Sequence, residues 1–341
     1  DLSPAHMIAF RNGILNMKDG SFTAFSPEHV ITNRIEWDYN PHAYSEITDK
    51  TLDKIACNDP NIRALLEEAA GFCLFRRNEL GKAFILTGTG SNGKSTYLNM
   101  LKHMLGRQNI SSLDLKKLGD RFSTVMLFGK LANIGDDISD EFIVDASIFK
   151  KIVTGETIDA EQKGQPKFEF EPYTKLFFSA NNIPRMGKGR DSAAILRRLV
   201  IIPFDAKFSS DDPDYNPHIG DMLRSQESME YLIQLGLKGL KRVLKTKKFS
   251  ESEKVQKELE EYEESNNPIL GFIREVEMDD EFKIENEPTK DVYKRYQEYC
   301  LANNLQPMSN IEFSKQINRI LNMQVVVKRI GNKTHRLFVP R

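Results

Sequence analysis

The stretch LTGTGSNGKSTYLNML, Leu86–Leu101, places three glycines before a lysine and two hydroxyl residues. Four of these residues match the pattern G-x-x-x-x-G-K-[ST], in which backbone N–H groups surround phosphate oxygens. The preceding KAFILTG predicts a buried strand, and KSTYLNMLKHML predicts a helix whose positive dipole end faces the loop. We therefore expect a nucleoside triphosphate site, with Lys94 on the β- and γ-phosphates and Ser95 as a ligand of Mg²⁺. The residues expected to hold the nucleotide are Gly88, Thr89, Gly90, Ser91, Asn92, Gly93, Lys94, Ser95 and Thr96.

The segments on either side of this loop predict the fold class. Within residues 82–205, the apolar stretches GKLANIG, KLFFSAN and RLVIIPF alternate with helical stretches. Alternation of this kind is typical of an α/β core with a mostly parallel sheet. Upstream, Asn12-Gly13 and Asp19-Gly20 are hairpin turn pairs, and a helical stretch follows them. We interpret residues 1–75 as a small α+β lead-in and 76–249 as the ATPase core.

The C-terminal part differs in composition. The segment SESEKVQKELEEYEES, Ser250–Ser265, carries seven acidic residues against two lysines and predicts a solvated linker helix over 250–267. Residues 268–341 predict three helices and then a hairpin around Gly331-Asn332, with Ser309 as the N-cap of the last helix. From Phe313 to Arg341 there are seven Lys or Arg and no Asp or Glu. This pattern favours a winged-helix-like domain that binds nucleic acid; the alternative is a basic surface on a purely packing domain.

Polar residues at the ends of the predicted strands are the candidates for catalysis. Asp136 and Asp137 follow one strand, and we assign Asp136 to the metal and Asp137 to the general base, although the two roles could be exchanged. Asn181 ends KLFFSAN, where its amide could orient the attacking water. Arg197 and Arg198 stand at the entrance of RLVIIPF; either is surface charge or one completes a neighbouring subunit's site.

Composition limits the remaining possibilities. The net charge is −1, so any basic surface that binds nucleic acid is local. The three cysteines are far apart in the sequence and form no C-x-x-C pair, which argues against a zinc site and favours a reducing compartment. No apolar run approaches the length of a membrane span, and we expect no signal peptide. We expect a cytoplasmic protein, and the first residue, Asp1, is compatible with a fragment of a longer chain.

Four stretches in order carry a resemblance to a known family: GTGSNGKST, ANIGDD, KKIVTGETIDAEQKGQPKFEFEPYTKLFFSAN and RRLVIIPF. Together they resemble motifs A, B, B′–C and the arginine-finger strand of superfamily 3 helicases, a branch of the AAA+ ATPases. The chain is most similar to the C-terminal helicase region of phage and plasmid primase–helicases, and FRNGILN resembles the segment before that core. The resemblance is strongest over 80–205. Many relatives carry Glu where this chain has Asp in motif B.

The third stretch bears on how the energy of hydrolysis is used. Thr157–Glu161 and Lys167–Glu171 predict two strands that present Lys163 at the tip of a hairpin, beside Gly164. The resemblance implies that this hairpin lines the pore of a ring and that its lysine grips the DNA backbone. A compact ammonium suits that task because it holds any phosphate without reading sequence. Without the flanking motifs, Lys163 would be an ordinary loop lysine; Lys151 and Lys167 are further candidates for this surface.

The resemblance implies an ATP- and Mg²⁺-dependent DNA helicase that moves on single-stranded and forked DNA as a ring, expected to be a hexamer. It also implies a phage or mobile-element replication system in a bacterial host and a possible primase domain or primase partner. The tail would add DNA contacts through Lys315, Arg319, Lys328 and Arg329. Two alternatives stay open: an AAA+ ATPase that remodels or loads protein partners, and a primase-associated origin-binding module without unwinding activity.

Overall fold

The fold was analysed in a computed structural model, which describes residues 4–341 except 137, 140, 142, 144 and 188–189. By internal contacts the chain forms two compact units, Asp1–Met186 with Ala194–Leu259, and Gly187–Ala193 with Glu260–Arg341. The first unit contains both the lead-in and the ATPase sheet, and one hydrophobic cluster that runs from Ile8 to Val255 joins the two. The predicted α/β class is confirmed.

The lead-in is a four-stranded sheet followed by two helices. The strand order is β3-β2-β1-β4, in which β1 pairs antiparallel with β2 and parallel with β4. The first turn lies one residue earlier than the sequence pattern predicts, because Phe10 pairs with Gly13 and the two loop residues are Arg11 and Asn12. The elements are β1 (Met7–Phe10), β2 (Gly13–Asn16), β3 (Phe22–Thr23), β4 (Arg34–Ile35), α1 (Glu46–Ile55) and α2 (Pro60–Phe72).

The central sheet has five parallel strands in the order β11-β5-β10-β7-β6. The strand that precedes the glycine-rich loop, β5, therefore lies between β10 and β11, and all its residues are buried. Short helices and a hairpin interrupt the order in sequence. The elements are β5 (Ala83–Thr87), α3 (Lys94–Leu105), η1 (Arg107–Asn109), β6 (Ile110–Ser111), η2 (Leu115–Gly119), η3 (Thr124–Leu127), β7 (Ala132–Gly135), α4 (Ser147–Thr154), β8 (Ile158–Ala160), β9 (Phe168–Phe170), β10 (Lys175–Ala180), α5 (Arg190–Leu196), β11 (Leu199–Pro203), α6 (Ile219–Met222) and α7 (Gln226–Thr246).

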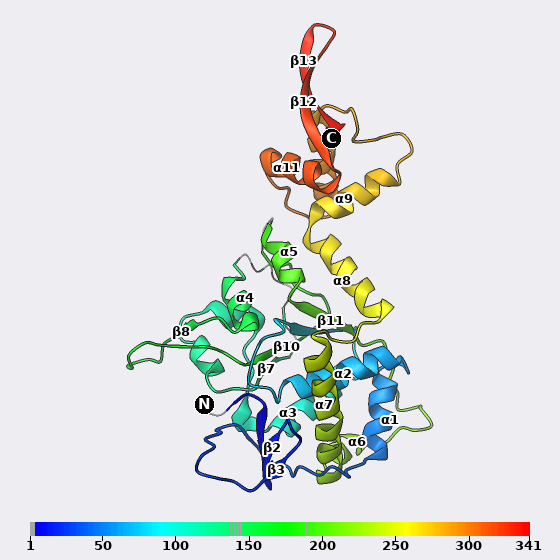
Figure 1. The fold of residues 1–341 in the computed structure, drawn as a ribbon. Helices are drawn as coiled ribbons and strands as arrows, with labels where there is room; N and C mark the ends of the chain where they lie inside the picture. The colour runs from blue at the N-terminus through cyan, green and yellow to red at the C-terminus, as the bar shows by residue number, and fades with distance from the viewer. Residues whose placement is uncertain (1–3, 137, 140, 142, 144, 188–189) are drawn as a thin grey trace. The chain divides into compact units, whose positions relative to one another are not determined.

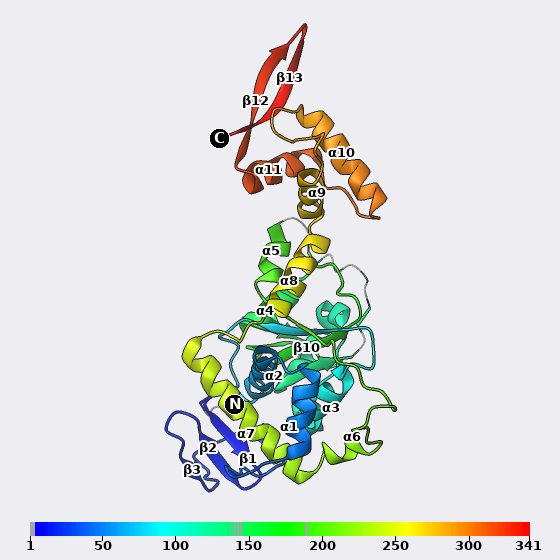
Figure 2. The ribbon, with the colours of Figure 1, turned by 90° about the vertical axis from the view of Figure 1, so that its right-hand side faces the viewer.

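Helices cover both faces of this sheet, as a parallel sheet requires. Figures 1 and 2 show α2, α3 and α7 on one face and α4 on the other. Phe84 of β5 and Phe177 of β10 stack at 4.7 Å between ring centroids and belong to the core shared with α2 and α7. Alternate residues such as Ile85 and Phe178 are also buried and turn to the opposite face.

Helices α2 and α7, which cover the same face of the sheet, approach each other unusually closely. A Cβ added at Gly71 of α2 would lie 1.8 Å from the carbonyl oxygen of Gly236 in α7, so neither helix can carry a side chain at this crossing. On the same interface, a Cβ at Gly239 would lie 2.7 Å from the backbone of Glu67. Small residues at both positions let α7 pack along α2 at backbone contact distance.

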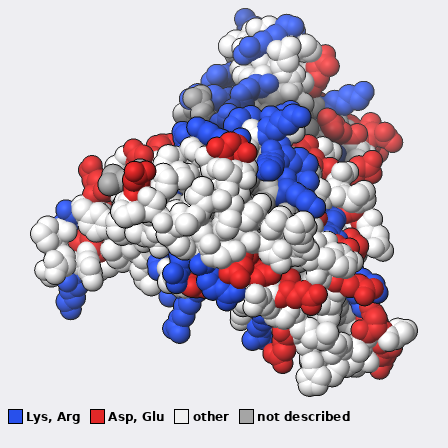
Figure 3. Space-filling model, turned by 60° about the horizontal axis from the view of Figure 1, so that its bottom comes forward, with Lys and Arg blue, Asp and Glu red and all other residues white. Residues whose placement is uncertain are grey.

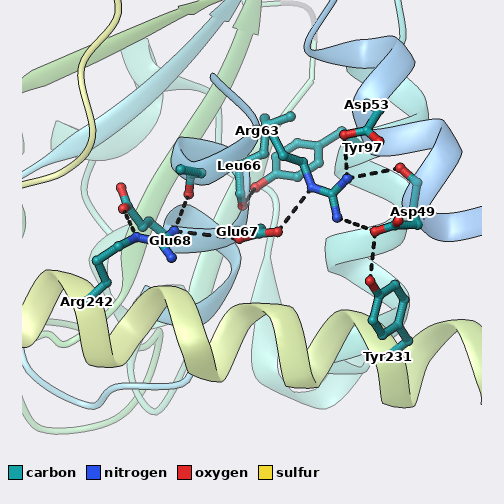
Figure 4. Close-up of polar contacts among 10 residues, drawn as sticks. Asp49, Asp53, Arg63, Leu66, Glu67, Glu68, Tyr97, Tyr231 and Arg242 are labelled. Carbon is teal, nitrogen blue, oxygen red and sulfur yellow. Dashed lines mark hydrogen bonds and ion pairs between the residues drawn. The ribbon is translucent and has the colours of Figure 1, made fainter. Parts of the chain in front are cut away.

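A polar network ties α1 and α7 to α2 (Figure 4). Arg63 of α2 donates to Asp49 and Asp53 of α1 at 2.6 and 2.7 Å, and Tyr231 of α7 donates to Asp49 at 2.7 Å. Although burial favours the neutral acid, the bonds from Arg63 and Tyr231 hold the pKa of Asp49 below its usual range. Arg242 of α7 pairs with buried Glu68 at 2.7 Å. Breaking one partner of such a set leaves a buried charge unpaired, so the network fixes the position of α1.

The second unit is built as predicted, from helices followed by a long hairpin. Ser309 caps the last helix by accepting from the backbone N–H of Glu312 at 3.3 Å, so the predicted N-cap is confirmed. The charged helix α8 is not purely solvated, because Val255 and Tyr262 are buried. The elements are α8 (Glu253–Asn266), whose C-terminal part belongs to this unit, α9 (Pro268–Glu277), α10 (Thr289–Ala302), α11 (Asn310–Ile320), β12 (Met323–Ile330) and β13 (Lys333–Pro340).

One lysine is buried in the core of the first unit. Lys175, which starts β10, is 1% exposed, and its Nζ donates to the carbonyl oxygens of Phe75 and Tyr173 at 2.5 and 2.7 Å. The ammonium position lies 4.5 Å from the centroid of the Phe72 ring. Burial lowers the pKa of Lys175 from 10.5 to about 7.

This burial predicts a pH-dependent stability. Above pH 7 the unfolded chain keeps the proton on Lys175 while the folded chain releases it, so the unfolded state binds more protons and the free energy of unfolding rises with pH. We expect a rise of about 2 kcal/mol between pH 7 and about 8.5, at up to about 1.4 kcal/mol per pH unit. Denaturant unfolding of the wild type and Lys175→Met over this range measures the difference. Parallel curves for the two proteins would contradict the prediction.

Candidate nucleotide-binding site and nucleic-acid interface

The loop between β5 and α3 adopts a backbone that glycine makes possible. Gly88, Gly90 and Gly93 have φ of 148°, 113° and 93°. A Cβ at Gly88 would lie 2.0 Å from Nδ2 of Asn92 and 2.6 Å from the carbonyl oxygen of Phe204. Gly93 is the N-cap of α3 in the left-handed conformation, and a Cβ there would meet Ile55 of α1 at 2.7 Å. The loop is thus wrapped tightly around the N-terminus of α3, with its backbone free to approach a ligand.

Two of the predicted catalytic residues meet beside this loop. Lys94 is 6% exposed, and its Nζ donates to the carbonyl oxygen of Gly88 and to Oδ1 of Asn181 at 3.3 Å. Asn181 follows β10, which is hydrogen-bonded to β5, so neighbouring parallel strands deliver both side chains to one edge of the sheet. These two contacts place the Lys94 ammonium between the phosphate loop and the end of β10.

A cavity of about 760 Å³ opens at this edge. Its floor is formed by Thr89–Thr96 and Asn181, which include all of the predicted nucleotide-binding residues except Gly88. The other walls come from α1 and from the segment that follows β11, neither of which the motif pattern indicates. The wall residues are Glu46, Ile47, Lys50, Thr51, Lys54, Phe208, Ser209, Ser210, Asp212, Asp214, Tyr215, Asn216 and Ile219.

An ion-pair cluster joins these two walls. Lys54 of α1 donates to Asp212 at 3.0 Å and to Asp214 at 3.1 Å, and it lies 4.8 Å from the centroid of the Phe208 ring. Burial lowers the pKa of Lys54, but the two carboxylates outweigh it and leave the pKa raised. The backbone N–H of Phe208 donates to the carbonyl oxygen of Ser91 at 2.9 Å, which ties the segment to the phosphate loop.

The predicted metal carboxylate does not line the cavity. Asp136 follows β7, and its half-exposed carboxylate pairs with Lys102 of α3 at 2.5 Å. Asp137, the predicted base, lies outside the described residues. Ser95, the other predicted Mg²⁺ ligand, does line the cavity. The part of the chain that the structure describes contains no cluster of three or more His, Cys, Asp or Glu suited to a metal.

The two arginines lie at the opposite edge of the sheet from the phosphate loop. In the parallel pairing of β11 with β5, Leu199 is opposite Ala83, so Arg197 and Arg198 precede the start of the strand while the loop follows its end. Five strand residues separate the edges by about 15 Å. Neither arginine lines the cavity. Arg197 is exposed, whereas Arg198 donates to the carbonyl oxygen of Ala194 at 2.6 Å, and its buried Nε has no partner among the described residues.

The predicted hairpin forms, with shorter strands than expected. Strands β8 and β9 pair antiparallel, and Figure 1 shows the hairpin projecting away from the sheet. The backbone N–H of Gln165 donates to the carbonyl oxygen of Gln162 at 3.0 Å, with Gly164 at φ 78°, so Lys163 occupies the first central position of a tight turn. Lys163 is exposed and forms no ion pair within the described chain. Lys167 differs, because it lies 3.6 Å from Glu161.

The basic residues of the second unit are exposed at two places. Lys315 and Arg319 stand four residues apart on α11 and share one helix face. Lys328 and Arg329 are adjacent in β12, opposite His335 and Thr334, so they turn to opposite faces of the hairpin. One DNA strand on one face of the hairpin would therefore contact only one of these two side chains.

None of the helices in the described ranges is both long and apolar enough to cross a bilayer.

Comparison with protein families finds three adjacent matches along the chain. Residues 2–70 match "D5 N terminal like", residues 86–198 match a family of unknown function (DUF5906), and residues 264–338 match "Poxvirus D5 protein-like". The order of these matches follows the order of the lead-in, the ATPase core and the C-terminal unit.

Curated relatives and solved structures agree with these matches. The chain is 28% identical over 218 residues to the candidate helicase L207/L206 of Acanthamoeba polyphaga mimivirus, covering 60% of this chain and 22% of the relative. It is 24% identical over 228 residues to the candidate helicase 184R of Invertebrate iridescent virus 6, covering 61% and 23%. The chain thus spans less than a quarter of the length of these relatives.

Among solved structures, two apo forms of the NrS-1 C-terminal region match with TM-scores of 0.59 and 0.55 at 15% and 16% identity. They cover 95% and 100% of this chain and 81% and 84% of theirs, so they show the same fold. The predicted resemblance to the C-terminal helicase region of phage and plasmid primase–helicases is confirmed as a resemblance to a phage or viral primase–helicase-like region.

Proposed function

We propose that this chain is an ATP-driven DNA helicase of a viral or mobile-element replication system, and that it works as a ring. The observation that carries the proposal is the cavity at the carboxyl edge of the sheet, where the phosphate loop, Lys94 and Asn181 converge. The candidate helicases among its relatives support DNA as the substrate on which the energy is used.

We assign the parts of hydrolysis as follows. Lys94 leaves Asn181 for the β- and γ-phosphates, and the backbone N–H groups of Thr89–Thr96 surround the same oxygens. Ser95, and Asp136 once it has left Lys102, would hold Mg²⁺, and the bound ion would supply positive charge against the phosphates. Asn181 orients the water that attacks the γ-phosphorus, and Asp137 takes its proton, or Asp136 does if the roles are exchanged. The ADP–phosphate bond breaks as the new P–O bond forms.

The base and ribose face the remaining walls. Ile47 and Tyr215 offer apolar surface on either side of the cavity, and the Lys54–Asp212–Asp214 cluster holds α1 and the segment after β11 together around it. This arrangement supports a nucleoside triphosphate rather than an inorganic polyphosphate as the substrate.

The position of the arginines supports a site that two subunits share. Arg197 and Arg198 lie at the far edge of the sheet and cannot complete their own subunit's cavity, whereas a head-to-tail ring brings this edge to the next subunit's phosphate loop. Each junction would then couple hydrolysis to its β8–β9 hairpin, and Lys163 would pull on a DNA phosphate. We expect six subunits in the ring. The functional segments of each subunit would be 1–75, 76–249, 250–267 and 268–341. The C-terminal unit would bind forked DNA.

Two other functions make different predictions. An ATPase that remodels or loads proteins would hydrolyse ATP at a rate indifferent to single-stranded DNA. A primase-associated origin-binding module would bind nucleotide tightly without turnover. Stimulation of hydrolysis by single-stranded DNA, together with strand displacement, separates the helicase from both.

Removing the phosphate-binding ammonium tests the site. Lys94→Ala is expected to lower ATP hydrolysis by at least about 100-fold, because the substitution removes a preorganised positive charge that stabilises the negative charge developing on the phosphate. Phosphate release measured with and without single-stranded DNA gives the result, with the exposed Lys18→Ala as the control. Hydrolysis at the wild-type rate would refute the assignment of the loop.

Removing the charge at the hairpin tip tests the coupling to DNA. Lys163→Ala is expected to keep basal ATP hydrolysis and to lose unwinding of forked DNA, since the residue is exposed and does not line the cavity. Lys167→Ala is the informative comparison, because that side chain is already paired with Glu161 and is expected to have a smaller effect. Unwinding at the wild-type rate by Lys163→Ala would remove this residue from the DNA path.

Mixed subunits test the shared site. Arg198→Ala is expected to bind ATP but to hydrolyse it about 1,000-fold more slowly, the magnitude typical of an arginine supplied to a phosphoryl transfer. Mixing it with Lys94→Ala subunits creates junctions that combine an intact loop with an intact arginine, so part of the activity is expected to return. If no mixing ratio restores hydrolysis and Arg197→Ala behaves in the same way, neither arginine acts across subunits.

A further inference from the structure

The C-terminal part of α7 and the two residues that follow it carry a concentration of positive charge that nucleotide hydrolysis does not use. Between residues 238 and 248 there are six cations and no Asp or Glu. These cations are Lys238, Lys241, Arg242, Lys245, Lys247 and Lys248. Figure 3 shows that Lys and Arg side chains on the face drawn gather into groups instead of alternating evenly with acidic ones.

The structure divides these six cations into two kinds. Arg242 pairs with Glu68 at 2.7 Å, and Lys247 pairs with Glu79 at 3.0 Å, so both serve the packing of α7 and its end. The other four, Lys238, Lys241, Lys245 and Lys248, are exposed and make no side-chain ion pair or hydrogen bond within the residues that the structure describes. We call these four residues the α7 lysine row.

Three of the four residues lie along one face of a rigid helix, and Lys248 follows the end of that helix. Lys238, Lys241 and Lys245 follow the spacing i, i+3, i+7, which places them within about 60° of one another and over about 10 Å of the helix axis. The opposite side of α7 is buried, and Gly236 and Gly239 hold it at backbone contact with α2. The three ammonium groups are therefore presented together by an element that cannot easily turn away.

Stabilisation of the helix end explains only part of this arrangement. A cation interacts favourably with the helix dipole only within the last turn, which applies to Lys245 and not to Lys238 or Lys241. Three unpaired like charges on neighbouring turns repel one another, by a few tenths of a kcal/mol for each pair. Lysines that repel one another and are exposed to solvent are best explained by an anionic partner that binds them.

The composition of the row favours a nucleic acid over a protein as that partner. Lysine is depleted at protein–protein interfaces, where aromatic residues, Met and Arg are enriched, and the row contains no such residue. A lysine ammonium is a compact charge suited to phosphate oxygens, and such contacts position a strand without reading its sequence.

We propose that the α7 lysine row is a second contact with the DNA backbone, on the outer surface of the first unit and separate from the Lys163 hairpin. The choice of DNA as the polyanion rests on the proposed function. The row would hold a strand or the flanking duplex during translocation, so it contributes to affinity and not to hydrolysis.

The salt dependence of binding tests the row directly. The variant with Lys238, Lys241 and Lys245 each changed to Gln is measured by fluorescence anisotropy on a labelled single strand and on a labelled duplex, over a series of salt concentrations. If all three contact phosphates, the negative slope of log K against log salt is expected to become shallower by about 2 on the single strand or by about 3 on the duplex. ATP hydrolysis without DNA is expected to be unchanged.

A matched control removes the same charge elsewhere. Changing Lys18, Arg107 and Lys207 to Gln removes three exposed cations that are scattered over the first unit. This control is expected to keep the wild-type slope, and thermal unfolding shows that both variants fold.

Two results would overturn the proposal. One is a wild-type slope for the row variant on both DNA forms. The other is loss of self-assembly with DNA binding intact, which would assign the row to a protein contact. If the proposed function is wrong, the result is different: the rate of ATP hydrolysis by the wild-type protein would not respond to DNA at all.

Discussion

The buried parallel strand β5 is the constraint on which the rest of the structure depends. Because it pairs with β10 and β11 and is covered on both faces, its end is fixed, and Gly88 follows at a point where any Cβ would collide. The loop can therefore only turn around the N-terminus of α3. The same pairing brings Asn181 beside Lys94 and sends the two arginines to the opposite edge. The strand order thus determines that Lys94 and Asn181 lie at the site and that the two arginines do not.

The lead-in belongs to the site as well as to the fold. Helix α1 supplies one wall of the cavity, and Arg63 of α2 holds it through Asp49 and Asp53. Tyr231 of α7 joins the same network, while the far end of α7 carries the lysine row. The nucleotide wall and the proposed DNA surface are consequently connected through one rigid helix, which gives a physical route by which occupancy at one site can bias the other.

The sequence predicted the features that are local in the chain. The phosphate loop, the core strands, the β8–β9 hairpin and the Ser309 cap each depend on residues within about ten positions of one another, so their spacing is informative. The cavity walls at Ile47 and Phe208 could not be predicted, because they meet the loop only through tertiary packing. The pairing of Asp136 with Lys102 joins residues 34 positions apart, and the burial of Lys175 depends on its contact with Phe75, 100 positions away. The first turn shifted by one residue, since strand pairing outweighs the preference of Asn-Gly.

The central claim is that hydrolysis at a junction between two copies of this chain moves DNA. The most direct measurement is the rate of strand displacement on forked DNA with ATP, followed over a range of protein concentrations while the mass of the assembly is determined in the same samples. We expect displacement only where a multimer forms on the DNA, with a steep dependence on protein concentration. A monomer that separates strands at the full rate would contradict it.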